Sequence, residues 1–151
     1  MGILNITPDS FSDGGKYLKL DNAIKRAEEL TKQGAEIIDI GAESTRPGSS
    51  AVNSNEELDR MSPVVKKLAS NYTLSIDTYK AKTAEKCLEL GAKIINDITA
   101  LRHDDAMASI IKEYNSEIVL MFSKKKEPHA DLAEREYKDL IKEIIDFYQP
   151  E

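Results

Sequence analysis

Five short apolar runs alternate with helical patterns along the whole chain, and this alternation constrains the fold more than any other feature. The runs cover residues 3–6, 36–40, 74–77, 94–97 and 118–121 and are rich in Ile and Leu. Runs of this length and composition are typical of strands buried in a parallel sheet. The repeated order of strand and helix predicts an α/β fold with a parallel sheet and right-handed crossovers.

The segments between the runs carry helix signals. Asp21 can cap a helix after the first run. Ser54, with Glu57 three residues later, forms a capping-box pattern for a second helix, which Pro63 is expected to kink or restart. Glycines at 34 and 91 are expected to stop the first and third helices. The remaining helices are expected from 78 or 80 to 88, at 107–111 and at 137–148.

Composition excludes several classes of function. The chain has 21 basic and 27 acidic residues and a formal net charge of −6, which argues against a nucleic-acid backbone or an anionic membrane as the main partner. A single cysteine, Cys87, excludes a disulfide framework. No apolar run approaches the roughly 18 residues of a membrane span, and no leader pattern follows Met1. We therefore expect one cytoplasmic domain over residues 1–151.

Polar residues recur where the predicted strands end. Asn5, Asp77 and Asn96 lie at the carboxyl ends of three strands, where parallel βα folds bind their ligands. Polar groups are costly to bury unpaired, so their recurrence predicts a ligand site. Asp97 can instead be a turn former or a helix cap. Asp39 lies between two isoleucines, and we interpret it as an internal hydrogen-bonding residue.

Two long polar loops, residues 7–19 and 41–53, follow the first and second strands. Loops of this length are commonly functional. Phe11 and Arg46 are large groups between flexible glycines, which is typical of lids that close on a ligand. The alternative is a solvated loop with an incidental aromatic residue.

The residues in these loops resemble a known family. Residues 1–15, Met-Gly-Ile-Leu-Asn-Ile-Thr-Pro-Asp-Ser-Phe-Ser-Asp-Gly-Gly, resemble the first signature of the dihydropteroate synthases. Residues 38–48, Ile-Asp-Ile-Gly-Ala-Glu-Ser-Thr-Arg-Pro-Gly, resemble the second. Ser-Ile-Asp-Thr at 75–78 and Ile-Asn-Asp at 95–97 follow in the family's order. The resemblance covers essentially the whole chain and implies a (β/α)8 TIM barrel, of which about five of the eight βα units are present.

The resemblance also implies a reaction. The family condenses 6-hydroxymethyl-7,8-dihydropterin pyrophosphate with p-aminobenzoate to give 7,8-dihydropteroate and pyrophosphate, and Mg2+ assists the departure of pyrophosphate. By the same resemblance Asn5 is a ligand of Mg2+, for which an amide oxygen is a suitable hard donor. Asp77 and Asn96 bind the edge of the pterin, and Met121 packs on its face. The arylamine pocket is implied at Asp9, Phe11, Thr45, Arg46 and Pro47. Asp77, Asn96 and Arg46 are the residues expected to take part in catalysis.

The chain departs from the family pattern in two ways. Phe122 stands where the family usually has a His, so a role for that His does not carry over. His129 and the lysines at 124–126 are most simply solvated, with phosphate attraction as an alternative for the lysines. The sequence also lacks the family's later Asp-Pro-Gly-x-Gly-Phe, Ser-Arg-Lys and Arg-x-His segments. A complete barrel of this kind takes about 250 residues.

Three hypotheses follow. The leading one is the N-terminal part of a dihydropteroate synthase, whose activity belongs to the complete barrel and which in the family can form a homodimer. The second is a non-catalytic pterin-binding or assembly half-barrel, because five βα units leave two open sheet edges. The third is a pterin-binding barrel like the methyltetrahydrofolate methyltransferases, a class that does not need the two loops.

Overall fold

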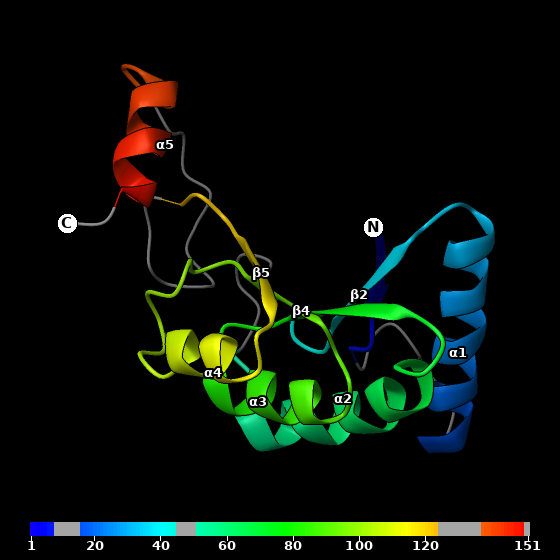
Figure 1. Ribbon diagram of the computed structural model, residues 1–151. Helices are drawn as coiled ribbons and strands as arrows, with labels where there is room; N and C mark the ends of the chain where they lie inside the picture. The colour runs from blue at the N-terminus through cyan, green and yellow to red at the C-terminus, as the bar shows by residue number, and fades with distance from the viewer. Residues whose placement is uncertain (8–15, 45–50, 124–136, 150–151) are drawn as a thin grey trace.

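A five-stranded parallel sheet forms the centre of the molecule (Figure 1). The computed structural model describes residues 1–7, 16–44, 51–123 and 137–149. The strands lie in the order β1-β2-β3-β4-β5, and each neighbouring pair is parallel. The predicted α/β fold with a parallel sheet is therefore confirmed. The strands are β1 (Gly2–Asn5), β2 (Ile37–Gly41), β3 (Thr73–Asp77), β4 (Ile94–Asp97) and β5 (Glu117–Leu120).

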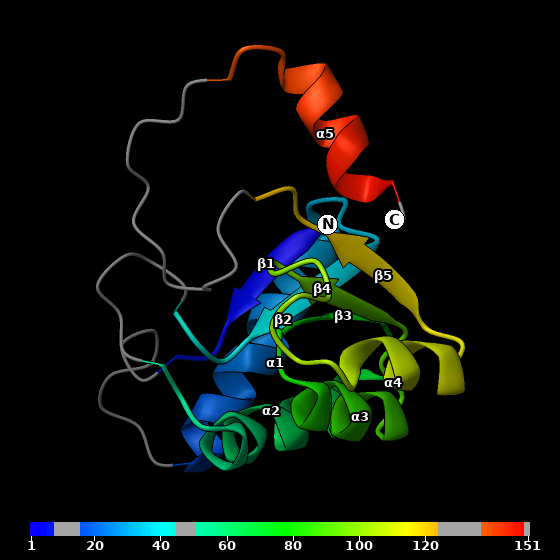
Figure 2. The ribbon, with the colours of Figure 1, turned by 90° about the vertical axis from the view of Figure 1, so that its left-hand side faces the viewer.

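Four helices cover one face of this sheet, and a fifth stands apart. Figures 1 and 2 show α1 to α4 on one side of the strands, whereas α5 lies on the other side, beyond the end of β5. None of the helices within the described ranges is long and apolar enough to cross a membrane. The helices are α1 (Lys16–Lys32), α2 (Ser54–Leu68), α3 (Ala81–Glu89), α4 (Met107–Glu113) and α5 (Leu140–Tyr148).

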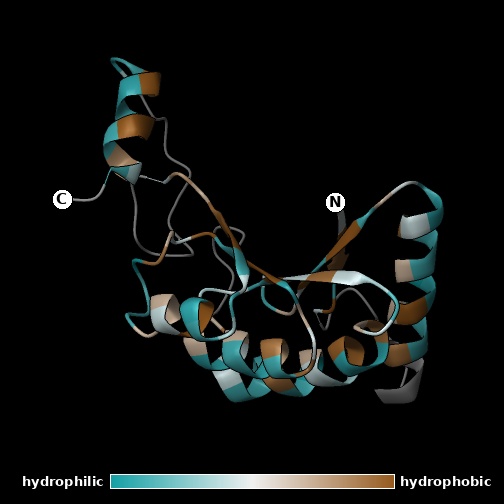
Figure 3. Ribbon diagram, in the orientation of Figure 1, coloured by the Kyte–Doolittle hydropathy of each residue, from teal (hydrophilic) through white to brown (hydrophobic). Residues whose placement is uncertain are grey.

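The hydrophobic core lies between the sheet and α1–α3. Because successive side chains of a strand point to opposite faces, every second strand residue faces the helices. Figure 3 shows hydrophobic residues along the strands and on the sides of these helices that face the sheet. The helices contribute Ala27 of α1, Met61 and Val65 of α2, and Cys87 of α3, a free thiol whose pKa burial raises to about 12. The strands contribute Leu4, Ile38, Ile40, Leu74, Ile76 and Ile95.

The helix boundaries differ from the predicted ones for local reasons. The helix α1 begins at Lys16, so Asp21 lies inside it and is not its cap. The cap of α2 is Asn53, whose side chain accepts a hydrogen bond from the Glu56 amide at 3.0 Å, and Glu57 is buried and does not complete a capping box. Pro63 lies inside a continuous α2. Pro63 is exposed, so water can hydrate the carbonyl group that its missing N–H leaves free.

Both predicted glycine stops are confirmed. Gly34 follows α1 with φ +99°, and Gly91 follows α3 with φ +106°. These values lie in the left-handed region, which glycine adopts without the steric cost of a Cβ atom. The two glycines therefore end their helices and turn the chain into β2 and β4.

One face of the sheet is buried and the other is exposed, and replacing an isoleucine on each face tests this difference. Ile76 of β3 faces the helices and is 0% exposed, whereas Ile3 of β1 is 63% exposed. We expect Ile76→Ala to lower the free energy of unfolding by about 2–5 kcal/mol. Ile3→Ala, the matched control, should change it by no more than about 0.5 kcal/mol. Urea unfolding of the 151-residue chain gives both values, and equal losses would contradict this assignment of the faces.

Candidate functional site

One row of residues crosses the sheet at the carboxyl ends of its strands. Asn5 pairs with Gly41, Gly41 with Asp77, and Asp77 with Asn96. Paired residues of parallel strands point to the same face, so these positions share the face opposite the core helices. Figure 2 shows the strands that carry them side by side. The predicted gathering of Asn5, Asp77 and Asn96 at one end of the sheet is confirmed.

Gly41 allows the polar groups of its neighbours to approach each other across β2. A methyl group at Gly41 would lie 3.2 Å from Oδ2 of Asp77 and 3.5 Å from Oδ1 of Asn5. A Cβ contact of 3.2 Å is tighter than ordinary van der Waals contact. The space above Gly41 is therefore bounded by a carboxylate oxygen on one side and an amide oxygen on the other.

Asp39 is the internal hydrogen-bonding residue that the sequence predicts. It is 5% exposed and accepts a hydrogen bond from the Ser75 hydroxyl at 2.6 Å and from Nδ2 of Asn96 at 3.2 Å. Because the Asn96 amide nitrogen donates to Asp39, the Asn96 carbonyl oxygen is directed elsewhere. This bond orients the Asn96 amide, which keeps its carbonyl oxygen and its second N–H for a ligand.

The pKa of the Asp77 carboxyl group is strongly raised. Burial raises its pKa from 3.8 to about 7, and the negative charges of Asp39, Glu57, Glu43 and Asp97 add to the effect. Both causes disfavour the charged form of a carboxyl group. Asp77 can therefore accept or donate a hydrogen bond at physiological pH.

Asp97 forms the turn that the alternative interpretation expected. Its Oδ1 accepts hydrogen bonds from the amide and the hydroxyl of Thr99, both at 2.7 Å, and its Oδ2 accepts one from the Leu101 amide at 2.8 Å. These bonds hold Ala100 and Leu101 at φ 52° and 63°, in the left-handed region. Asp97 therefore shapes the loop before α4 and does not face a ligand with a free carboxylate.

A buried ionic network lies beside this row, and the sequence reasoning missed it. The Lys80 ammonium pairs with Glu43 and, at 3.1 Å, with Glu57. The Tyr79 hydroxyl donates to Glu43 at 2.6 Å, and the Thr83 hydroxyl donates to Glu57 at 2.9 Å. Burial, followed by this bond to Glu43, raises the pKa of Tyr79. One signal was available, because Glu57 stands four residues before the core residue Met61 and therefore on the inward side of α2.

The end of β5 is fixed by aromatic contacts. Phe122, in the place of the family's usual His, lies 5.1 Å from the ring of Phe147 and 6.0 Å from that of Tyr137. The guanidinium of Arg102 lies 4.6 Å from the Phe147 ring. Phe122 therefore joins the end of β5 to α5 through packing. Met121 lies one residue beyond β5 and is 44% exposed.

Several predicted site residues lie outside the described residues. These are Asp9, Phe11, Thr45, Arg46, Pro47 and His129, together with the lysines at 124–126. The structure brings together Asn5, Asp77 and Asn96 and places Met121 just after β5, but it does not test the predicted arylamine pocket.

The oxygen atoms of Asn5 and Asp77 could bind a hard cation that takes its remaining ligands from water or substrate. Oδ1 of Asn5 and Oδ2 of Asp77 both border the space above Gly41. In the described part of the chain, no group of three or more His, Cys, Asp or Glu residues could hold a metal ion by itself. This donor set suits Mg2+, which usually retains waters and phosphate oxygens in its coordination shell.

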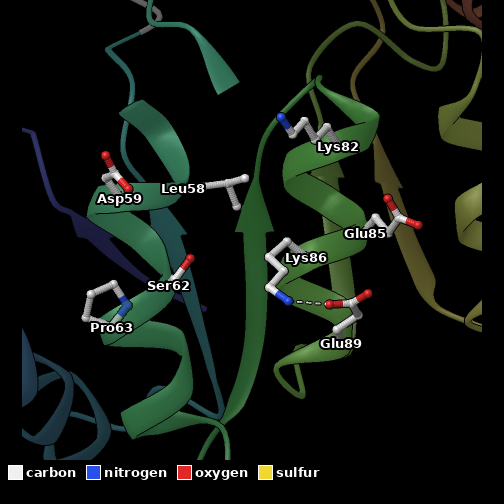
Figure 4. A pocket seen from close by; sticks show the side chains of 8 residues that line it. All are labelled: Leu58, Asp59, Ser62, Pro63, Lys82, Glu85, Lys86 and Glu89. Atoms are coloured by element: carbon white, nitrogen blue, oxygen red, sulfur yellow. Dashed lines mark hydrogen bonds and ion pairs between the residues drawn. The ribbon is translucent and has the colours of Figure 1, made fainter. Parts of the chain in front are cut away.

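A groove of about 560 Å3 between α2 and α3 is a separate feature (Figure 4). Its lining mixes charges with a few apolar groups, and Lys86 pairs with Glu89 across 2.6 Å within it. The groove lies on the helix side of the sheet, away from the row that contains Asn5 and Asp77. It does not contribute to the candidate site.

A comparison with protein families identifies the class of protein to which the chain belongs. A family model described as pterin binding enzyme matches residues 1–150. The chain belongs to this family of pterin-binding enzymes. Its sheet of alternating βα units is part of a TIM barrel, since the similar solved structures are dihydropteroate synthase barrels.

The similar proteins are dihydropteroate synthases. The chain is 48% identical to the Bacillus subtilis enzyme over 147 residues, which is 96% of this chain and 49% of the relative. The Clostridium difficile enzyme, solved in the presence of pteroic acid, matches with 49% identity and a TM-score of 0.85 over 97% of this chain and 54% of that one. The Xanthomonas albilineans enzyme, solved with 4-aminobenzoic acid, matches with 36% identity and a TM-score of 0.82 over 97% and 51%. The chain spans about half the length of these relatives.

The raised pKa of Asp77 predicts a pH-dependent cost to stability. Between its ordinary pKa of 3.8 and about 7, the folded chain binds this proton more strongly than the unfolded chain, so stability falls as pH rises through this range. Asp77→Asn removes that fall. The stability of the variant relative to the parent should rise from pH 4 to pH 8, by at most about 4 kcal/mol.

Urea unfolding at pH 4, 6 and 8 measures this difference. Asp59→Asn, an exposed carboxylate on α2, is the control and reports the loss of a surface charge alone. A difference between parent and Asp77→Asn that stays constant with pH would contradict the raised pKa.

Proposed function

We propose that the chain forms the pterin-binding half of a dihydropteroate synthase, which joins 6-hydroxymethyl-7,8-dihydropterin pyrophosphate to p-aminobenzoate. The observation that carries the proposal is the row Asn5, Gly41, Asp77 and Asn96 at the carboxyl ends of β1 to β4. The 48% identity to the Bacillus subtilis dihydropteroate synthase also supports the proposal.

Asp77 and Asn96 suit the edge of a pterin. The pterin ring presents adjacent N–H donors and acceptors, so it needs partners of both kinds in one plane. Asp77, with a pKa of about 7, can accept through its carboxylate and can also donate when protonated. Asn96 offers its carbonyl oxygen and its second amide N–H, since the first N–H donates to Asp39. Met121, exposed just beyond β5, is the proposed apolar wall for the ring face.

We also propose that Asn5 holds Mg2+. Its amide oxygen borders the same space as Oδ2 of Asp77, and we propose that this space receives the pyrophosphate of the bound pterin. When bound, Mg2+ would supply positive charge against the departing pyrophosphate. A cytoplasmic location belongs to the same proposal.

The second substrate is assigned from the sequence signatures. Asp9, Phe11, Thr45, Arg46 and Pro47 match the family positions for the arylamine pocket. They follow β1 and β2, the strands that carry Asn5 and Gly41. Arg46 is the proposed cationic group near the reacting ends of the two substrates.

Binding and turnover separate the hypotheses. We expect the 151-residue chain to bind the pterin pyrophosphate, and Mg2+ to strengthen this binding. Turnover with p-aminobenzoate is expected only after fusion to the later βα units of the Bacillus subtilis enzyme. Absence of binding would contradict the proposal, and turnover by the chain alone would contradict the need for further units. Binding that is indifferent to Mg2+ would favour a methyltransferase-like barrel.

A second candidate is the non-catalytic half-barrel. In the described sheet β1 and β5 each pair with a single neighbour, and Ile3, Val119 and Met121 are exposed. An open edge and exposed apolar groups are typical of a surface that another chain covers. Pterin binding without turnover in the fused protein would favour this candidate.

Gly41→Ala tests the role of the space above β2. The new methyl group would lie 3.2 Å from Oδ2 of Asp77, so it should displace the carboxylate and narrow the gap to Asn5. We expect at least a tenfold loss of affinity for the pterin pyrophosphate, equal to about 1.4 kcal/mol. Isothermal titration calorimetry with Mg2+ present measures it.

The matched control is Gly91→Ala, at the opposite end of the sheet. This glycine has φ +106°, and a methyl group there would lie 3.0 Å from Cβ of Ala69. The control should lose stability and keep its pterin affinity. An unchanged affinity in Gly41→Ala would contradict the proposed site.

A further inference from the structure

A buried lysine connects the two strand ends that flank the candidate site. The chain leaves β2 at Gly41 and reaches Glu43 two residues later, and it leaves β3 at Asp77 and reaches Lys80 three residues later. The Lys80 ammonium pairs with Glu43 and so links these two ends directly. The same ammonium lies 3.1 Å from Glu57 of α2. Lys80, which follows β3, therefore binds the segment that follows β2 and also binds α2, the helix that connects β2 to β3 along the chain.

Neighbouring contacts reinforce the same junction. The Tyr79 hydroxyl donates to Glu43 at 2.6 Å, and the Lys80 ammonium lies 4.5 Å from the centre of the Tyr79 ring. Arg60 of α2 donates to the Ala42 carbonyl at 2.7 Å. The end of β2 is thus held by α2 through Arg60 and by the segment after β3 through Tyr79 and Lys80.

Burial makes this ionic contact a strong constraint. The side chains of Lys80, Glu43 and Glu57 are 12%, 3% and 1% exposed. Water therefore screens their attraction little, and removing one partner leaves an uncompensated buried charge. Movement at one strand end would therefore weaken an ion pair that water cannot readily replace.

The distance between the ends of β2 and β3 matters for the site. Asn5 and Asp77 approach each other across Gly41, and their two oxygens border one space. A shift of β3 relative to β2 would move Asp77 while Asn5 stayed with β1 and β2. Catalytic geometry tolerates displacements of only about 1 Å before function falls.

We propose that Lys80 is a positioning residue of the pterin site: by pairing with Glu43 and Glu57 it fixes the end of β3 against the end of β2, and so fixes Asp77 relative to Asn5. This inference rests on the proposed function for its ligand. It assigns Lys80 no contact with substrate, because its ammonium is engaged with the two buried carboxylates.

Lys80→Met is the central test, because it keeps most of the apolar stem and removes the charge. We expect at least a tenfold loss of affinity for 6-hydroxymethyl-7,8-dihydropterin pyrophosphate, measured by calorimetry under conditions where the variant is fully folded. Lys80→Arg restores a cation and should recover most of that loss. Leu68→Ala, at the far end of α2, is the control for lost stability and should keep affinity within about twofold.

A second measurement does not depend on the ligand. Amide hydrogen exchange should rise at least tenfold at residues 42–44 and 78–80 in Lys80→Met, and it should not rise selectively there in Leu68→Ala. If the parent binds no pterin, the proposed function fails, and the exchange result still decides the positioning role.

Two outcomes overturn the proposal. The first is an affinity in Lys80→Met equal to that of the parent or of Leu68→Ala. The second is exchange at the two strand ends that matches the rest of the chain. Should Lys80→Met not fold, the pair Lys80→Met with Glu43→Gln removes both charges of the link and leaves Glu57 bonded to Thr83. The same affinity loss and the same local exchange are then expected.

Discussion

The parallel register of the sheet determines where every polar group of the site lies. Asn5, Gly41, Asp77 and Asn96 pair one with the next across four strands, so the side chains of Asn5, Asp77 and Asn96 lie on one face at the same level of the sheet. The residue before each of them in its strand, such as Leu4, Ile40 or Ile76, points to the helices and forms part of the core. A slip of one residue in any strand would exchange these two sets. Burial of the core therefore holds the site in place.

The site also depends on the partners that stabilise the buried carboxylates around it. Asp39 is satisfied by Ser75 and Asn96, and Asp97 by the loop before α4. Glu43 and Glu57 share the ammonium of Lys80. Asp77 faces the open side of the sheet, and its pKa rises to about 7 because it is buried near these charges. Asp77, whose pKa is raised to about 7, is also the carboxyl group that we propose to bind the pterin.

Much of the architecture and the core of the site could be predicted from the sequence. Five apolar runs at the correct places gave the strands, and the strand-end positions of Asn5, Asp77 and Asn96 predicted their meeting, because parallel strands bring their carboxyl ends together. Local capping was harder to predict. Asp21 and Ser54 both match a cap in isolation, but α1 begins earlier and Asn53 makes the bond at α2. Capping patterns compete with neighbouring residues, and tertiary contacts decide which one is used.

The ionic network was missed for a different reason, although the place of Glu57 on the inward side of α2 was one signal for it. Glu43, Glu57 and Lys80 come from three segments that are distant in sequence, and side chains of their types are usually solvated. Only their burial shows that they act together. The role of Phe122 likewise became clear from its contacts with Tyr137 and Phe147, which lie up to 25 positions away in sequence.

Pterin recognition and turnover place different demands on this chain. Asn5, Asp77 and Asn96 all belong to β1, β3 and β4, so their arrangement is complete within the described strands. The face that carries them is open, with Ile3 and Val119 exposed, whereas the interior of a closed TIM barrel is packed with side chains. The similar proteins named dihydropteroate synthases are about twice as long as this chain. Under the proposed function, affinity for the pterin is therefore the property that Asn5, Asp77 and Asn96 would define most directly, and reaction with an arylamine would require the closed, water-excluding site of a complete barrel.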